Sequence, residues 1–171
     1  DLILEGARRV WRQLILMEDA VMVYRIVRSP ERRVFYIGVG GLNPKAINYD
    51  GIPRVTYSEP EVASVGLTAA SAKARGIEIK ELSYDLAGNG KAQILKTAGS
   101  VKLVAAKNGP ILGIHMVGAR VGELLAEAQL IYNWEAEAVD VAQFIHAHPT
   151  LSEAMGEAHL ALAGKPLHAH G

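Results

Sequence analysis

The sequence predicts an α+β fold, in which helices pack on one face of an antiparallel sheet of four or five strands. Two β-rich runs, residues 101–106 and 111–117, are separated only by a short turn that contains Gly109 and Pro110, which is the pattern of a β-hairpin. Beyond residue 120 the apolar spacing changes to three or four residues, which is typical of helices with one buried face. Both strands of the hairpin are expected to lie in one antiparallel sheet.

Length and composition limit the classes of protein to consider. The chain has 171 residues, half of them apolar, so one ordinary domain with a substantial core and an extension can be built. Its 18 basic and 18 acidic residues give a formal net charge of zero, which favours neither nucleic acid nor an anionic membrane as a partner. No apolar run approaches the roughly 20 residues of a membrane span, and no basic segment precedes the apolar N-terminus. We therefore expect a soluble, cytoplasmic protein.

The first 41 residues predict one helix and one strand. Apolar residues recur every three or four positions over residues 1–28, which indicates a helix packed on one side. Ser29-Pro30 ends this helix, because proline disfavours the helical conformation of the residue before it. Residues 34–39 have the composition of a strand, and residues 40–44 form a linker. The arginines of this region are explained better by a solvated helix face than by contact with DNA.

From residue 52 onward the chain predicts short strands and helices in alternation. Thr68 opens a helix that Gly76 ends, and Asn89-Gly90 indicates a turn. The predicted extended segments before the hairpin are 54–58 and 77–86, and the predicted helices are 68–75, 121–132, 139–145 and 152–162. The last of these helices is closed by Gly164-Lys165-Pro166.

His148 and Glu153 form the candidate catalytic pair, five residues apart on either side of the rigid Pro149. A neutral imidazole can take a proton near pH 7. A carboxylate bonded to the far ring nitrogen fixes the tautomer and stabilises the imidazolium that forms. This chemistry predicts a general acid/base pair.

Glu153 also has a purely structural interpretation. Thr150 and Glu153 have the spacing of a capping box, with Thr150 as the N-cap and Glu153 at the third helical position. Spacing alone favours the cap, because capping boxes far outnumber catalytic pairs. The two roles could compete for the same carboxylate oxygens. Nearby His146 is expected to be packed or hydrogen-bonded rather than catalytic.

The six histidines do not predict a metal site. They include the alternating pairs His146 with His148 and His168 with His170. The chain has no cysteine and no clustered carboxylate frame around these pairs, so neither predicts a closed metal site. The absence of cysteine also excludes disulfides and thiol catalysis by this chain itself. A metal-binding domain remains the third-ranked hypothesis.

Several segments in register carry a resemblance to one enzyme family. The segments are residues 53–68, which begin Pro53-Arg54-Val55-Thr56-Tyr57-Ser58-Glu59-Pro60, then 88–92, 113–118, 122–124, 126–130, 148–153 and 164–170. In this order they resemble the C-terminal interface domain of dihydrolipoamide dehydrogenase, over residues 42–171. The resemblance implies an interface domain that forms a homodimer.

The resemblance also implies roles for the candidate pair. His148 occupies the position of the family's catalytic base and Glu153 that of its carboxylate partner, and the base serves the redox centre of the other subunit. The family uses FAD and NAD, whose domains and reactive cysteines have no counterpart in residues 1–41. We therefore expect no cofactor in this chain, which alone should self-associate but be redox-silent.

Residues 1–41 resemble a different class of protein. Segments 11–14, 17–20, 23–26 and 29–37 are similar to a part of the portal proteins of large contractile-tailed phages. Together the two resemblances predict a chimera, joined near residues 38–42. The alternative function is a structural or assembly module in which the pair of His148 and Glu153 has no catalytic role.

Overall fold

The computed structural model describes residues 47–167, which belong to one compact unit over residues 46–171. The predicted helix at 1–28, the strand at 34–39 and the linker at 40–44 lie outside the described residues, as do His168 and His170.

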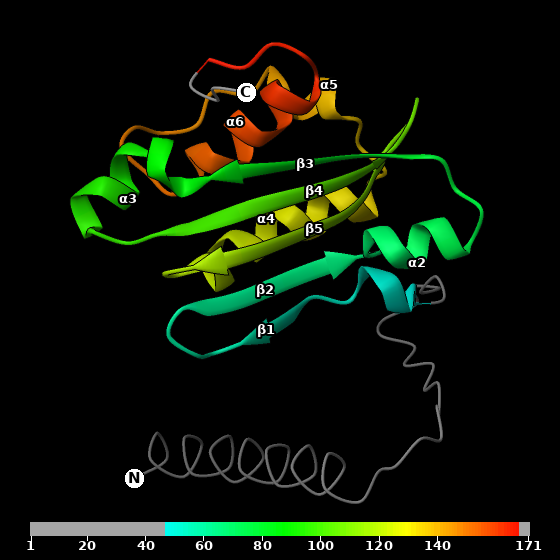
Figure 1. The fold of residues 1–171 in the computed structure, drawn as a ribbon, viewed down its shortest axis with the longest axis horizontal. Coiled ribbons are helices and arrows are strands. Elements are labelled where there is room, and N and C mark those ends of the chain that lie inside the picture. Colours follow the sequence, from blue (N-terminus) through cyan, green and yellow to red (C-terminus); the bar gives the residue numbers. More distant parts are fainter. Residues whose placement is uncertain (1–46, 168–171) are drawn as a thin grey trace, which may run out of the picture. The chain divides into compact units, whose positions relative to one another are not determined.

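Five antiparallel strands form a single sheet in the order β1-β2-β5-β4-β3 (Figure 1). The strands are β1 (Arg54–Thr56), β2 (Glu61–Gly66), β3 (Ile79–Asp85), β4 (Gly99–Ala106) and β5 (Ile111–Gly118). The predicted hairpin is confirmed: Leu103 pairs with Ile114 across β4 and β5, and a register shift follows at Val104 and Ala105. Strand β2 had not been assigned from the sequence pattern, and it supplies the partner on the other side of β5.

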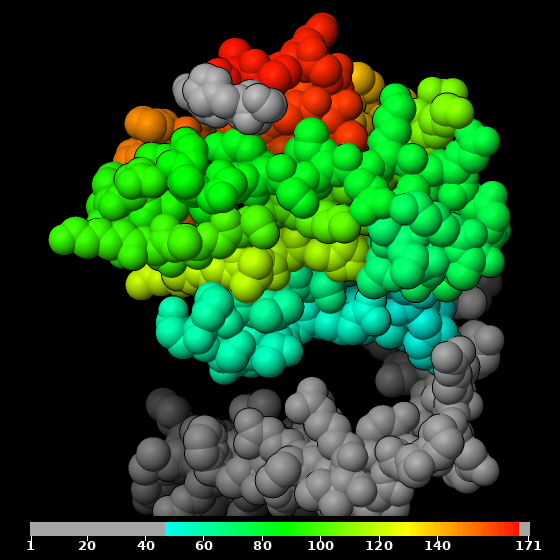
Figure 2. All heavy atoms as spheres, viewed as in Figure 1, coloured from blue at the N-terminus to red at the C-terminus, as the bar shows by residue number. Residues whose placement is uncertain are grey.

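Two long helices cover the main apolar face of this sheet. Helix α4 (Val121–Asn133) packs on β2 and β5, and helix α6 (Glu153–Leu162) packs on β3 and β4, with α5 (Ala138–Ala142) against α6. Figure 2 shows the C-terminal helix resting against the side of the sheet that β3 and β4 form. Alternate residues of β4, Val101 and Leu103, are fully buried here. Each such side chain contributes about 1.5–3 kcal/mol when it leaves water. The predicted α+β class is therefore confirmed.

A smaller cluster lies on the opposite face, at one end of the sheet. Val104, which points away from the main core by strand alternation, packs there with Leu67 and with Ala72, a residue of α2 (Ala69–Ala74). Thr68 caps α2 by accepting a hydrogen bond from the Ser71 backbone N–H at 3.1 Å. The predicted start of this helix is confirmed.

The prediction of a turn at Asn89-Gly90 is wrong. A single 3-10 turn, η2 (Leu86–Gly88), leads directly into helix α3 (Gly90–Leu95), and Asn89 is the N-cap of that helix. Asparagine is as favourable at an N-cap as in a turn, because its side-chain oxygen can accept from an early helical N–H in either setting. The predicted helix at 139–145 is also too long, since α5 ends at Ala142.

Candidate functional site

A loop between α5 and α6 carries both histidines of interest. We call residues 143–152 the histidine loop. The loop places His146 and His148 beside the N-terminus of α6, where Glu153 is the first helical residue. The peptide bond between His148 and Pro149 is cis.

The loop brings the predicted pair together. His148 Nδ1 lies 2.8 Å from Glu153 Oε1, and the side chains are 75% and 25% exposed. Because an ionised carboxylate can only accept, this contact assigns the proton to Nδ1 in the neutral ring. Nε2 then carries the lone pair, on a ring that is open to solvent. The arrangement can accept a proton from a group that approaches the outer edge of His148.

Glu153 also serves the loop backbone with its other oxygen. Glu153 Oε2 accepts from the Thr150 N–H at 2.8 Å, which is one half of the predicted capping box. The other half is absent, because the Thr150 hydroxyl donates to the Ala147 carbonyl at 2.6 Å and the residue before α6 is Ser152. The prediction of Thr150 as N-cap is therefore wrong. The two roles of Glu153 do not compete, since each uses a different oxygen.

The environment of Glu153 favours its ionised form. Partial burial acts to raise the pKa of this carboxyl group. The hydrogen bonds from Thr150 and from His148 outweigh that effect, so the pKa of Glu153 is lowered from its ordinary value. A carboxylate that stays ionised can stabilise a positive charge on His148.

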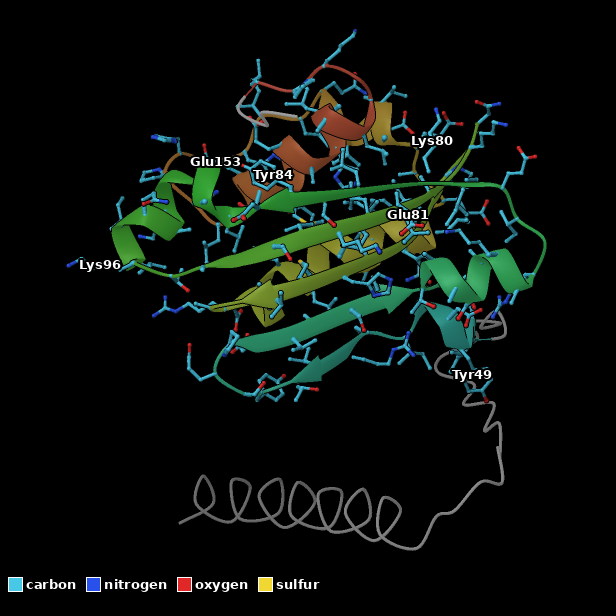
Figure 3. All side chains as sticks on the ribbon, viewed as in Figure 1. Tyr49, Lys80, Glu81, Tyr84, Lys96 and Glu153 are labelled. Atoms are coloured by element: carbon cyan, nitrogen blue, oxygen red, sulfur yellow. The ribbon has the colours of Figure 1, made fainter. Side chains whose placement is uncertain are left out.

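A hollow of about 260 Å³ lies next to this pair. Residues 88–90 line it together with Tyr84, His148, Glu153 and Glu157. Figure 3 shows Tyr84 beside Glu153, at the side of the sheet that faces α6. Burial first, and then the charges of Glu157, Glu153 and Asp85, raise the pKa of Tyr84. Its phenol therefore stays neutral at physiological pH.

His146 forms a second histidine–carboxylate pair, with a residue of another helix. Its Nε2 lies 2.7 Å from Glu127 Oε1 of α4, and the side chains are 13% and 32% exposed. The ring sits over Gly156 of α6, where a Cβ atom would lie only 2.7 Å from His146 Nδ1. The expectation that His146 is hydrogen-bonded is confirmed. Its partner Glu127 was not predicted, because nothing in the local pattern relates the two residues.

The remaining described histidines are structural. His115 Nε2 lies 3.0 Å from the Leu67 carbonyl oxygen. His159 is fully buried; its Nδ1 lies 2.6 Å from the Met155 carbonyl oxygen, and its Nε2 has no partner among the described residues. Burial, with a smaller contribution from His146, lowers the pKa of His159 to about 4. Residues 47–167 contain no group of three potential ligands that could hold a metal ion.

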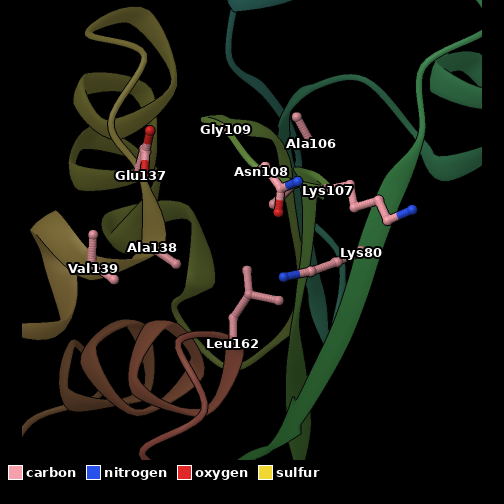
Figure 4. A pocket seen from close by; sticks show the side chains of 10 residues that line it. Lys80, Ala106, Lys107, Asn108, Gly109, Glu137, Ala138, Val139 and Leu162 are labelled. Atoms are coloured by element: carbon pink, nitrogen blue, oxygen red, sulfur yellow. The ribbon is translucent and has the colours of Figure 1, made fainter.

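A second hollow, of about 310 Å³, lies on the side of the molecule shown in Figure 4. It is bounded by the β4–β5 turn, the start of α5 and Leu162, and the Lys80 side chain extends into it. No histidine is among the described residues that line this hollow. Among the described helices, none is long and apolar enough to cross a bilayer.

Comparison with known proteins assigns the family. Residues 52–159 match the model of the pyridine nucleotide-disulphide oxidoreductase dimerisation domain, and the chain belongs to that family. Residues 3–49 match, weakly, the model of the bacteriophage T4-like portal protein (Gp20).

Individual relatives agree with this assignment. The chain is 45% identical over 130 residues to a dihydrolipoyl dehydrogenase of Bacillus subtilis, covering 75% of this chain and 27% of the relative. It is 42% identical over 124 residues to mitochondrial dihydrolipoyl dehydrogenase 2 of Arabidopsis thaliana, covering 71% and 24%. The chain thus spans about a quarter of the length of these relatives.

Solved structures show the same fold at lower identity. LpdA from Mycobacterium tuberculosis has a TM-score of 0.68 at 22% identity, over 71% of this chain and 27% of that one. The HOCl-induced flavoprotein disulfide reductase RclA from Escherichia coli has a TM-score of 0.63 at 19% identity, over 71% and 28%.

Proposed function

From its membership of this family, we propose that the chain is the dimerisation domain of a dihydrolipoyl dehydrogenase, and that His148 and Glu153 are its acid/base pair. The observation that carries the proposal is the contact of 2.8 Å between His148 Nδ1 and Glu153 Oε1, with the ring otherwise exposed. The names of the relatives supply the substrate class, a dithiol that is oxidised to a disulfide.

The proposed step is removal of a proton from a substrate thiol. A thiol with a pKa of about 8.5 is mostly protonated at neutral pH, and only the thiolate attacks a disulfide. In this proposal His148 Nε2 takes the proton, and Glu153 stabilises the imidazolium through Nδ1. Positioned acid/base catalysis of this kind contributes about a hundredfold to ten-thousandfold in rate.

The electrons are carried by groups that this chain does not provide. It has no cysteine, so the reactive disulfide must belong to other residues of the enzyme. FAD and NAD would perform the electron and hydride transfer in the complete enzyme. We propose that the chain by itself is redox-silent.

We further propose that the chain self-associates as a homodimer, with the histidine loop near the interface. Ile145 is 98% exposed, and Phe144 and Leu167 are also exposed beside it. These three apolar side chains border a hollow of about 300 Å³ that also includes His146 and Glu153. Exposed apolar groups that adjoin a candidate site are typical of a surface that meets another protein. A two-fold dimer would place each His148 near the other subunit.

Light scattering on a sizing column, over a concentration series, tests the dimer. We expect a dimer that persists on dilution, and Ile145→Asp should shift it toward monomer, because a charge would be buried in the interface. Val139→Asp, at another exposed apolar position of the chain, is the matched control. A wild-type monomer at all concentrations would contradict the proposal.

Catalysis can be tested in a graft, with residues 47–167 replacing the equivalent part of the 45% identical Bacillus subtilis enzyme. His148→Gln in that graft should lower kcat for dihydrolipoamide oxidation by about a hundredfold or more. His115→Gln, which changes a histidine remote from the loop, should leave kcat within about threefold, since no proton is transferred there. An unchanged rate in His148→Gln would exclude its role as the base.

A further inference from the structure

We propose that Asn89 is a positioning residue for His148, acting through Thr150, an inference that rests on the proposed function. Asn89 is only 3% exposed, although it lies between a 3-10 turn and a short helix. A buried amide group is retained only where its hydrogen bonds are made. Asn89 makes two of them, to two different parts of the chain.

Each end of the Asn89 amide has its own partner. Its Oδ1 accepts from the Ala92 N–H at 2.9 Å, which caps α3. Its Nδ2 donates to the Thr150 carbonyl at 3.0 Å, across 61 residues of sequence. The first bond is local and explains the helix start. The second bond joins the start of α3 to the histidine loop.

Thr150 is thereby held on both sides. Its N–H donates to Glu153 Oε2 at 2.8 Å, and its carbonyl oxygen accepts from Asn89. These two groups belong to successive peptide planes, so both planes that flank the Thr150 Cα atom are fixed. The first plane is the peptide bond between Pro149 and Thr150, and His148 directly precedes it. The direction from which His148 approaches Glu153 therefore depends on the bond from Asn89.

The segment that Asn89 starts also lies beside the imidazole ring. Glycine has no Cβ atom, but one built on Gly90 would lie 3.7 Å from His148 Cε1, so the start of α3 borders the ring. Residues 88–90 and His148 line the same hollow. Asn89 thus holds the loop from the carbonyl of Thr150, while its neighbour Gly90 borders the ring. Loss of the Asn89 donor would free the Thr150 carbonyl and loosen the geometry in which His148 meets Glu153.

The tautomer of His148 reports on this positioning. While Glu153 accepts from Nδ1, the neutral ring carries its proton on Nδ1. An imidazole free in water favours the proton on Nε2 instead. The ¹⁵N chemical shifts of the two ring nitrogens distinguish these forms. They can be measured on the full chain by NMR at about pH 9, well above the ordinary histidine pKa of about 6.5.

Asn89→Ser is the decisive variant, because serine is as favourable an N-cap as asparagine but is too short to reach Thr150. The wild-type chain should show His148 with its proton on Nδ1, identified by the loss of its signals in His148→Gln. In Asn89→Ser the two ¹⁵N shifts should move toward each other or exchange order, as the proton moves to Nε2. Thr68→Ala, which removes the cap of the similar short helix α2, is the control and should keep the wild-type shifts.

A folded Asn89→Ser chain with wild-type His148 shifts would overturn the inference. If that variant fails to fold, Asn89→Thr retains a capping oxygen, fills more of the space and is judged by the same shifts. The measurement needs no redox partner. A graft that is inactive while the tautomer responds to Asn89 would refute the proposed function alone, and an active graft with an unresponsive tautomer would refute this inference alone.

Discussion

The histidine loop contains two histidine–carboxylate pairs whose contacts are nearly equal in length but whose settings are opposite. His146 and Glu127 meet at 2.7 Å, and His148 and Glu153 meet at 2.8 Å. Only 13% of the His146 side chain is exposed, against 75% of His148. The partner of His146 comes from α4, on another side of the loop, whereas the partner of His148 is five residues away along the chain.

This difference teaches that pairing alone does not identify a base. His146 uses Nε2 for Glu127, and its Nδ1 faces the backbone of α6 at Gly156, so no ring nitrogen is left for a substrate. His148 uses only Nδ1 for its carboxylate, on an exposed ring. The first pair ties the loop to two helices. The second pair is held by the loop and is open on its outer edge.

The buried His159 should produce the largest effect, on the pH dependence of stability. The folded chain keeps this ring neutral down to about pH 4, whereas the unfolded chain takes up the proton near pH 6.5. The contribution of a neutral His159 to the free energy of unfolding should therefore be fully present above about pH 6.5. It should fall by up to about 1.4 kcal/mol per pH unit as the pH drops toward 4.

Urea denaturation between about pH 7 and pH 4 measures this slope. His159→Met, a buried side chain of similar size without a titrating group, should flatten it. An equal slope in the wild-type chain and in His159→Met would show that His159 does not cause the loss. This comparison separates a histidine with no carboxylate partner from the two that have one.

Replacing each paired histidine by alanine should show that the buried pair contributes more to stability than the exposed pair. His146→Ala removes a nearly buried ring and leaves Glu127 without its partner, so we expect a loss of about 2 kcal/mol in unfolding free energy. His148→Ala removes an exposed ring and should cost under about 0.5 kcal/mol. Urea denaturation at pH 7 measures both variants. Equal losses would contradict the distinction between the pairs.

A smaller effect is expected where His146 meets helix α6. In Gly156→Ala the new Cβ atom would lie 2.7 Å from His146 Nδ1, and overpacking of this kind costs about 1–3 kcal/mol. Alanine is about 1 kcal/mol better than glycine within a helix, which offsets part of the cost. We therefore expect a net loss near 1 kcal/mol by thermal or urea denaturation. In the His146→Ala background the same substitution should be stabilising, because the ring is gone.

An exposed carboxylate far from the loop should give the smallest effect. Glu81 lies 2.8 Å from Lys102 Nζ and 2.9 Å from Lys73 Nζ, and their hydrogen bonds lower its pKa to about 2. The stabilisation is therefore present above about pH 4.5 and is lost as the pH falls through about 2. Because both ion pairs of Glu81 are exposed, Glu81→Gln should change the melting temperature only slightly, and less at high salt. An effect that persists in 1 M salt would contradict this account.

Local patterns predicted the elements whose character is local. The hairpin of β4 and β5 follows from two β-rich runs around Gly109 and Pro110. Helices α4 and α6 follow from apolar residues that recur every three or four positions. A strand with a hairpin turn, or a helix with one apolar face, is specified within ten or fifteen residues. The capping role of Asn89 was missed because turns and N-caps use the same residue for the same reason.

The sequence by itself determined the fold class, the sheet hairpin, the helices that cover it and the candidate pair His148 and Glu153, because each depends on residues close together in the chain. Only the tertiary structure decided that Glu127 binds His146 and that Asn89 binds Thr150. It also decided that the two oxygens of Glu153 have separate partners. The contacts of Glu127 with His146 and of Asn89 with Thr150 join residues that are 19 and 61 positions apart. They depend on the path of the whole backbone, which no local spacing encodes.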